Sequence, residues 1–223
     1  MKRMCFLLFF ISLISGAYAQ DQWAAKVFAG TSQYLGDLNK ENPVYQSAPS
    51  YGFGLNFQEN LRYGFNLHFA YHTLKGSTAH LDDFVHPNYP GSQHRFNTRL
   101  IDVSAEAEFN FLPFEIYNIR KENFTPFIFA GLGFNYFLTD QENQFPLIIP
   151  FGLGIKYNIF ERFSIGIQWT AKKTFFDQMD GVTNISQPGK SALIHNDDWY
   201  HHAVFFITYH PFRESIKCPT YEE

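Results

Sequence analysis

Few residues of this 223-residue chain have the type and spacing that chemistry requires, and Glu106 and Glu108 are the most suggestive of them. Two carboxylates on one face can act as a general acid and a general base. Basic residues are expected near the same face, so we favour ion pairing over proton transfer. His201 and His202 are adjacent on a candidate strand, so their side chains point to opposite faces and cannot bind one metal ion.

A larger set of candidate metal ligands lies in one polar segment and comprises His80, His86, His94, Asp82 and Asp83. We favour a solvated loop for this segment, with a metal site as the alternative. The sequence Gly131-Leu132-Gly133 lacks the further glycine and the helix of a dinucleotide-binding fingerprint. We therefore predict that the protein is not an enzyme and has no catalytic, cofactor-binding or metal-binding residues.

The first residues resemble an export signal. Lys2 and Arg3 precede an apolar run from Cys5 to Ile14, and Ala17-Tyr18-Ala19 supplies a cleavage site. We predict that residues 1–19 are a signal peptide. Its removal leaves Cys218 as the one cysteine of the mature chain. An odd cysteine in an exported chain indicates either a disulfide to another chain or a free thiol.

Behind the signal, apolar and polar residues alternate. Eight runs have this period of two: Trp23–Tyr34, Tyr51–Gln58, Leu61–His72, Ile101–Phe111, Phe124–Phe137, Leu147–Phe160, Phe163–Lys172 and Trp199–His210. Each run is long enough to cross a bilayer at a tilt, and spanning strands must close into a barrel. The sequence therefore predicts an all-β fold, an eight-stranded antiparallel transmembrane outer-membrane β-barrel over residues 20–212.

The predicted connections differ in length. Short turns are expected at Glu59-Asn60 and Glu161-Arg162, and longer connections at about residues 36–49, 73–97, 138–146 and 176–197. Outer-membrane barrels keep their short turns in the periplasm. We therefore expect both chain ends in the periplasm, together with the connection Pro113–Asn123 and a C-terminal tail of residues 213–223.

Composition and barrel size limit what the protein can do. A net charge of −4 provides no basic field for nucleic acid, which we exclude as a partner. An eight-stranded barrel is only wide enough to be filled by side chains, so we predict a filled lumen and not a pore. The residues expected to form ion pairs in the periplasmic half of the lumen are Lys26, Arg62, Glu106, Glu108 and Lys156. Three pairs of inward-facing glycines are expected to make room for long charged neighbours: Gly52 and Gly54, Gly131 and Gly133, and Gly152 and Gly154.

Seven motifs in a specific order cover nearly the whole mature chain. They are Tyr34-Leu-Gly-Asp-Leu-Asn39, Ala105-Glu-Ala-Glu-Phe-Asn-Phe-Leu-Pro-Phe114, Pro126-Phe-Ile-Phe-Ala-Gly-Leu-Gly133, Pro150-Phe-Gly-Leu-Gly-Ile-Lys-Tyr157, Lys173-Thr-Phe-Phe-Asp177, Asp198-Trp199-Tyr200 and Cys218-Pro-Thr-Tyr221. In these motifs the chain resembles the PorG family, outer-membrane barrel components of the type IX secretion machinery. The resemblance implies attachment to a periplasmic ring of a PorK-type lipoprotein and a PorN-type protein. That machinery exports proteins that bear a C-terminal sorting domain and, in some bacteria, supports gliding motility.

We therefore hypothesise a non-enzymatic anchor that sits in outer-membrane lipid and needs no cofactor. The contact residues would be Cys218, through an intermolecular disulfide, and Pro219 and Tyr221, which would shape and pack the tail. One alternative is a structural or adhesin-like surface barrel. The other is a lipid-modifying barrel enzyme, with a rim set of His72, Ser77, His80 and Asp82.

Overall fold

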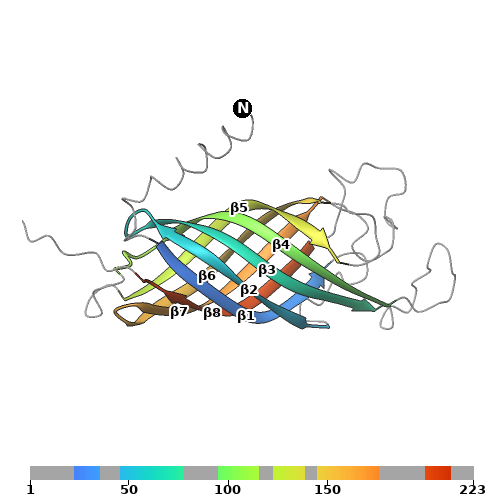
Figure 1. Ribbon diagram of the computed structural model, residues 1–223, viewed down its shortest axis with the longest axis horizontal. Coiled ribbons are helices and arrows are strands. Elements are labelled where there is room, and N and C mark those ends of the chain that lie inside the picture. Colours follow the sequence, from blue (N-terminus) through green and yellow to red (C-terminus); the bar gives the residue numbers. More distant parts are fainter. Residues whose placement is uncertain are drawn as a thin grey trace, which may run out of the picture.

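The protein is a closed barrel of eight antiparallel strands (Figure 1). The computed structural model describes residues 23–35, 46–77, 95–115, 123–138, 145–175 and 199–211. Its strands are β1 (Trp23–Leu35), β2 (Ala48–Gln58), β3 (Tyr63–Ser77), β4 (Arg95–Asn110), β5 (Phe124–Phe137), β6 (Leu147–Phe160), β7 (Phe163–Thr174) and β8 (Trp199–Tyr209). Each strand pairs with the next, and β8 pairs with β1 to close the barrel. None of the described residues belongs to a helix that is long and apolar enough to cross a membrane.

The alternation of residue types decides which face of each strand turns inward. Along β4 the even-numbered residues from Asp102 to Asn110 are buried, while Val103 and most of the other odd-numbered residues are partly or fully exposed. On β4, polar side chains therefore face the inside of the barrel and apolar side chains face its outside. This inversion of the pattern of a water-soluble protein is typical of a transmembrane barrel. The predicted fold class, including the filled lumen, is confirmed.

Several strand boundaries differ from those predicted. β3 continues to Ser77 and β4 begins at Arg95, so these two strands reach well into the connection expected at residues 73–97. The hydrophobic alternation fades there, but backbone pairing continues as far as Ser77 and Arg95. Conversely, Leu61 and Arg62 belong to a turn, and β3 begins only at Tyr63. Hydrophobic periodicity therefore located the membrane-facing part of each strand better than its ends.

The two ends of the barrel have different connections. We call the end with the turns at residues 59–62 and 161–162 the turn end, and the opposite end the loop end. β1 begins and β8 finishes at the turn end, because Ala25 pairs with Tyr209 there.

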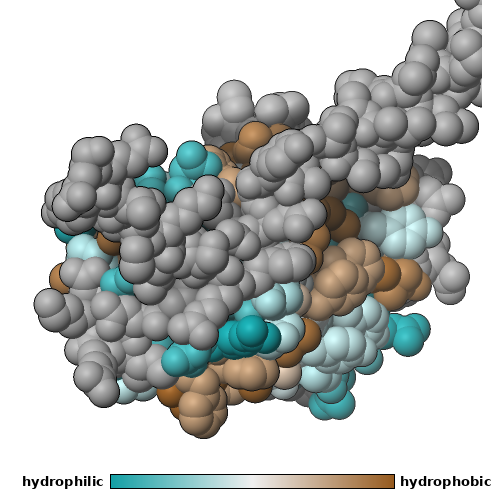
Figure 2. All heavy atoms as spheres, turned by 60° about the vertical axis from the view of Figure 1, so that its left-hand side comes forward, coloured by the Kyte–Doolittle hydropathy of each residue, from teal (hydrophilic) through white to brown (hydrophobic). Residues whose placement is uncertain are grey.

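Rings of aromatic side chains border the apolar outer surface at both ends. The aromatic residues at the turn end include Trp23, Phe57, Tyr63, Phe109, Phe163 and Tyr209, and those at the loop end include Tyr51, Tyr71, Tyr136 and Phe145. Exposed aliphatic and phenylalanine side chains such as Phe65, Leu132 and Ile167 lie between the two rings. Hydrophobic residues gather on the barrel wall in the face that Figure 2 shows. Two aromatic girdles around an apolar band match the interfaces and the core of a bilayer.

Candidate functional site

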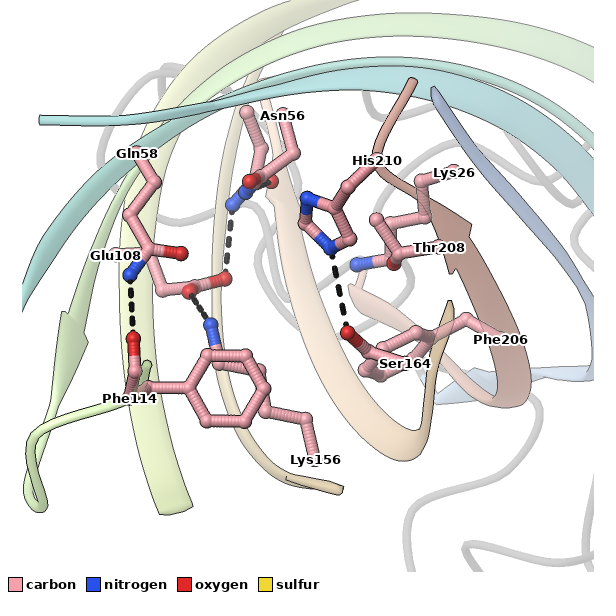
Figure 3. Close-up of a pocket in the computed structure, with 11 residues that line it drawn as sticks. Lys26, Asn56, Gln58, Glu108, Phe114, Lys156, Ser164, Phe206, Thr208 and His210 are labelled. Atoms are coloured by element: carbon pink, nitrogen blue, oxygen red, sulfur yellow. Dashed lines mark hydrogen bonds and ion pairs between the residues drawn. The ribbon is translucent and has the colours of Figure 1, made fainter. Parts of the chain in front are cut away.

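The lumen holds most of the polar side chains that could do chemistry, and it is filled in layers. At the turn end, Lys156 on β6 reaches Glu108 on β4, with an Nζ–Oε1 distance of 2.5 Å (Figure 3). The other carboxylate oxygen of Glu108 accepts a hydrogen bond of 3.0 Å from Asn66 Nδ2. Lys26 on β1, which was also expected to form an ion pair, donates a hydrogen bond to the uncharged amide oxygen Gln168 Oε1 at 2.7 Å. The carboxylate of Glu108 is therefore fully engaged in structural contacts.

Phe114 closes the lumen at the turn end. The chain folds back after β4, and the Phe114 amide donates to the Leu61 carbonyl at 3.0 Å. Gln58 Nε2 donates to the Phe114 carbonyl at 2.9 Å, and Lys156 Nζ lies 4.6 Å from the centre of the Phe114 ring. The cavity behind the ring measures about 20 Å³, which is room for one or two water molecules and not for a substrate. Sequence analysis missed this cap, because it lies in a segment expected to be a simple connection.

The prediction that Arg62 lies in the lumen is wrong. Arg62 is exposed in the turn at residues 59–62, and its guanidinium Nη1 donates to the Phe111 carbonyl at 2.8 Å. The polar face of the run was extended two residues too far, into the turn before β3. Arg62 therefore helps to hold the segment after β4 against the turn end and takes no part in the ion pairs of the lumen.

Glu106 has partners different from those of Glu108, although both face the lumen from β4. His68 Nδ1 lies 3.2 Å from Glu106 Oε2, and Ser104 Oγ donates to Glu106 Oε1 at 3.1 Å. The approach of His68 to Glu106 is an electrostatic contact and not a well-aligned hydrogen bond, because Glu106 Oε2 has no hydrogen-bond partner. Each carboxylate is therefore held by its own buried partners, and neither faces a space in which a substrate could lie.

A layer of aromatic side chains fills the middle of the lumen, comprising Phe28, Phe127, Phe129 and Phe206. Glycines on neighbouring strands make room for these rings. A Cβ atom at Gly52 would lie 2.6 Å from Phe28 Cζ, and one at Gly154 would lie 2.5 Å from Phe127 Cζ. The expectation that these glycines accommodate charged side chains is wrong, because the bulky neighbours are phenylalanines.

A second charged cluster lies between this aromatic layer and the loop end. Asp102 Oδ2 on β4 accepts hydrogen bonds from Lys172 on β7, from His72 Nε2 at 2.7 Å and from the Tyr200 hydroxyl at 3.3 Å. Alternation with apolar neighbours in the sequence puts Asp102, His72 and Lys172 on polar faces, but it does not bring them together. β3 and β4 are paired neighbours, but β7 is not paired with either of them. Alternation alone does not give the height at which residues on different strands meet.

His72 also contacts Ser50, so three side chains follow the order of a hydrolytic triad. Because His72 Nε2 donates to Asp102, its Nδ1 is free to accept from Ser50 Oγ at 2.8 Å. However, Ser50 is 1% exposed and His72 is 0% exposed. An apolar cluster towards the loop end comprises Tyr34, Leu74, Leu100, Phe137 and Tyr200. Since the Ser50 hydroxyl is enclosed and Lys172 neutralises Asp102, this geometry supports a structural network.

The rim set proposed for a lipid-modifying enzyme does not assemble as expected. His72 lies within the lumen, not at the rim, and Ser77 is also buried. His80 and Asp82 lie outside the described residues. The prediction of a rim position for His72 is therefore wrong.

Two imidazole nitrogens in the middle of the lumen lack hydrogen-bond partners. They are His68 Nε2 and His202 Nδ1, and both residues line a cavity of about 10 Å³ together with Gln168 and Lys172. This size is near the lower limit for one water molecule.

The buried charges balance. Among the described residues the ionisable lysines and carboxylates with buried side chains are Lys26, Lys156, Lys172, Asp102, Glu106 and Glu108, three of each sign. No three His, Cys, Asp or Glu side chains within the described ranges converge as a metal site. The described part of the lumen is therefore filled by side chains whose charges are balanced, and its cavities of about 10 and 20 Å³ leave no room for a solute. The predicted contact residues Cys218, Pro219 and Tyr221 lie outside the part of the chain that the structure describes.

Comparisons with other proteins agree with this architecture. The profile of a family described as "Domain of unknown function (DUF6089)" matches residues 2–220. Neisserial surface protein A has the same fold, with a TM-score of 0.50 and 11% sequence identity over 84% of this chain and 96% of that chain. The barrel domain of Pseudomonas aeruginosa OprF has a TM-score of 0.46 and 14% identity over 85% and 97%, and the outer-membrane enzyme PagL has 0.40 and 15% over 82% and 97%. No curated protein sequence matches the chain. At these identities the likeness concerns the fold alone.

Proposed function

Since the chain belongs to the DUF6089 family, we propose that it is a non-enzymatic outer-membrane anchor of a type IX protein-secretion machine. It tethers a periplasmic ring built from a PorK-type lipoprotein and a PorN-type protein, and in gliding bacteria it serves that motility as well. The motifs that resemble the PorG family support this assignment. The turn end and both termini face the periplasm, as short turns do in bacterial barrels.

The filled lumen is the observation that carries the proposal. Lys156 and Glu108 are paired, Asp102 is neutralised, and Phe114 covers the turn end. A barrel whose described residues leave no path for solutes through the lumen acts through its ends and its position in the membrane. An anchor needs both, and it needs no chemistry in the lumen.

The tail after β8 is the proposed tether. β8 finishes at the turn end, so the following residues leave the barrel on the side where the ring would lie. Cys218 forms a disulfide with a cysteine of the ring lipoprotein, and the two electrons pass to the thiol-oxidising system of the periplasm. Pro219 and Tyr221 shape the tail and pack it against the partner.

Paired reducing and non-reducing gels of purified outer membrane test the tether. The parent should give a heavier band that collapses on reduction, and Cys218→Ser should lack that band. Mass spectrometry of the heavier band should identify the ring lipoprotein. Thr220→Ala is the matched control, because it alters the tail at a position with no assigned contact and leaves the thiol available.

Recovery of the ring with the barrel and secretion of cargo give the functional readout. A single monomer band in every lane, with ring recovery and secretion unchanged in Cys218→Ser, would refute the tether. Deleting residues 78–94 separates the anchor from an adhesin-like barrel. An anchor with periplasmic contacts survives this deletion, whereas an adhesin that binds through its outer connections does not.

A further inference from the structure

Charged side chains outside the lumen are distributed unequally between the two ends. Among the described residues, those at the turn end carry both signs and comprise Glu59, Arg62, Glu115, Glu161 and Arg162. Those at the loop end are all basic and comprise Lys75, Arg95, Arg99 and Lys173. Within the described ranges, the charge outside the lumen at the loop end is therefore positive.

Three of these cations share one face of the β3–β4 pair, and we call Lys75, Arg95 and Arg99 the basic rim. The paired ends of β3 and β4 reach furthest at the right of Figure 1. Lys75 pairs with Asn97, so it is the diagonal neighbour of both arginines. Diagonal neighbours on one face are about 7–8 Å apart. No carboxylate in the described ranges lies on this face, so the three cations repel one another unless an anion from outside these ranges joins them.

The depth of the basic rim is that of lipid headgroups. Tyr71 and Tyr136 belong to the loop-end aromatic girdle, which marks the membrane interface. Arg99 lies one outward-facing pair beyond Tyr71, Lys75 lies two beyond, and Arg95 lies three beyond. Each such step advances about 7 Å along a strand, or about 5 Å along the membrane normal at the usual tilt. The basic rim therefore begins where the apolar band ends.

A groove beside the basic rim offers space for a headgroup. It has a volume of about 340 Å³ and is lined by Gln46, Lys75, Gly76, Arg95, Phe96 and Asn97. This volume falls in the range of small-molecule sites. Arginine can bind phosphate in a bidentate manner, and lysine contributes a compact charge.

We propose that the basic rim binds the phosphate groups of the glycolipid that forms the outer leaflet. The inference rests on the proposed orientation, with the loop end outside. The bound phosphates neutralise Lys75, Arg95 and Arg99, hold the barrel at a defined depth and couple it to the leaflet on which exported proteins emerge.

Native mass spectrometry of the full mature chain in dodecyl maltoside tests the proposal. The probes are lipid A with two phosphates, lipid A with one phosphate and a neutral diglycosyl-diacylglycerol. The parent should bind bisphosphorylated lipid A most tightly and the neutral lipid least. The triple variant Lys75→Gln/Arg95→Gln/Arg99→Gln should lose about a hundredfold in affinity for bisphosphorylated lipid A, since each cation near an anionic lipid surface contributes about fivefold.

The matched control is Arg62→Gln/Arg162→Gln, which removes two exposed cations from the turn end and should bind as the parent does. Heat-modifiable migration on gels identifies variants that have folded, and single-site variants replace the triple if it fails that check. An equal loss in the rim and turn-end variants, or no loss in the rim variants, overturns the proposal.

The rival anion source is the chain itself, through Asp82 and Asp83. If these carboxylates already neutralise the basic rim, Asp82→Asn/Asp83→Asn should gain lipid A affinity while the rim variants show no loss, and that result also overturns the proposal. The assay needs neither the ring nor secretion. A negative lipid A binding assay would therefore not contradict the proposed anchor function. A negative disulfide test would likewise not change the result of the lipid A assay.

Discussion

Lys156 and Glu108 form an ion pair across the lumen, with β5 between their strands and an Nζ–Oε1 distance of 2.5 Å. Removing one partner of a buried pair leaves an uncompensated charge, at a cost of roughly 3–5 kcal/mol. We expect Glu108→Gln and Lys156→Met each to lower the free energy of unfolding in urea and detergent by that order. The double variant should recover most of the loss. The exposed Arg62→Gln should change stability by about 0.5 kcal/mol or less, and strictly additive losses in the double variant would contradict this account.

Phe65 lies on the apolar outer face and is 53% exposed. Phe65 is paired with Phe57 of the turn-end ring. We therefore expect Phe65→Arg, whose cation must leave water, to cost less than the roughly 2–4 kcal/mol of a cation at the bilayer midplane and more than the roughly 0–1 kcal/mol of one at the interface. Ile165→Arg on β7 should behave similarly. Urea titration of barrels folded in lipid vesicles measures the loss, with Phe65→Leu as the control. Parent-like stability of both arginine variants would mean that the faces are assigned incorrectly.

Gly154 illustrates how closely the strands and rings approach inside the barrel. A Cβ atom there would lie 2.5 Å from Phe127 Cζ and 2.6 Å from the Ile167 carbonyl oxygen. Gly154→Ala should destabilise the barrel by about 1–3 kcal/mol, the usual cost of overpacking. Gly64→Ala is the matched control, since its nearest contact is 3.2 Å from the Phe57 carbonyl oxygen. The measurement is the temperature at which each variant loses heat-modifiable migration, and equal shifts would speak against steric crowding.

His210 follows β8 and lies at the turn-end mouth, where Ser164 Oγ approaches its Nε2 at 3.2 Å. Burial, and secondarily the charge of Lys156, lower the pKa of His210 to about 4. An unfolded histidine titrates near 6.5. The contribution of neutral His210 to the free energy of unfolding is therefore fully present above about pH 6.5 and is lost as the pH falls towards 4. The loss amounts to roughly 3 kcal/mol, at about 1.4 kcal/mol per pKa unit.

Urea unfolding at pH 7.5 and pH 4.5 checks this dependence. His210→Gln keeps a polar group beside Ser164 but cannot take up a proton, so its stability should fall less over this range than that of the parent. Identical pH profiles would show that other groups account for the change.

The barrel was predictable because successive side chains of a strand alternate between its two faces, so the position of a residue in the alternation is enough to assign it to the lumen or to the outer surface. Asp102 and Val103 reveal opposite environments without any knowledge of their neighbours. Contacts between strands were harder, since the meeting of His72 with Asp102 depends on the register of β3 and β4 and on strand tilt. Arg62 was misplaced because the alternation runs without a break into the turn.

Phe114 was missed for a related reason. Its burial depends on the chain folding back over the turn end after β4, and no periodicity records such a reversal. The glycines at positions 52 and 154 were recognised as space-making, but the ring that occupies each space comes from a neighbouring strand. Local sequence reveals that space is needed and leaves open which side chain fills it.

The pairing of β1 with β8 is the seam of the barrel, and it joins segments from opposite ends of the chain. Such a contact has a very high contact order, so it can form only after the last strand has been synthesised and delivered. Until then β1 presents a row of unsatisfied backbone groups, which is a template for aggregation. The chain therefore cannot mature strand by strand during translation. The edge of β1 is therefore open to non-native pairing until β8 arrives.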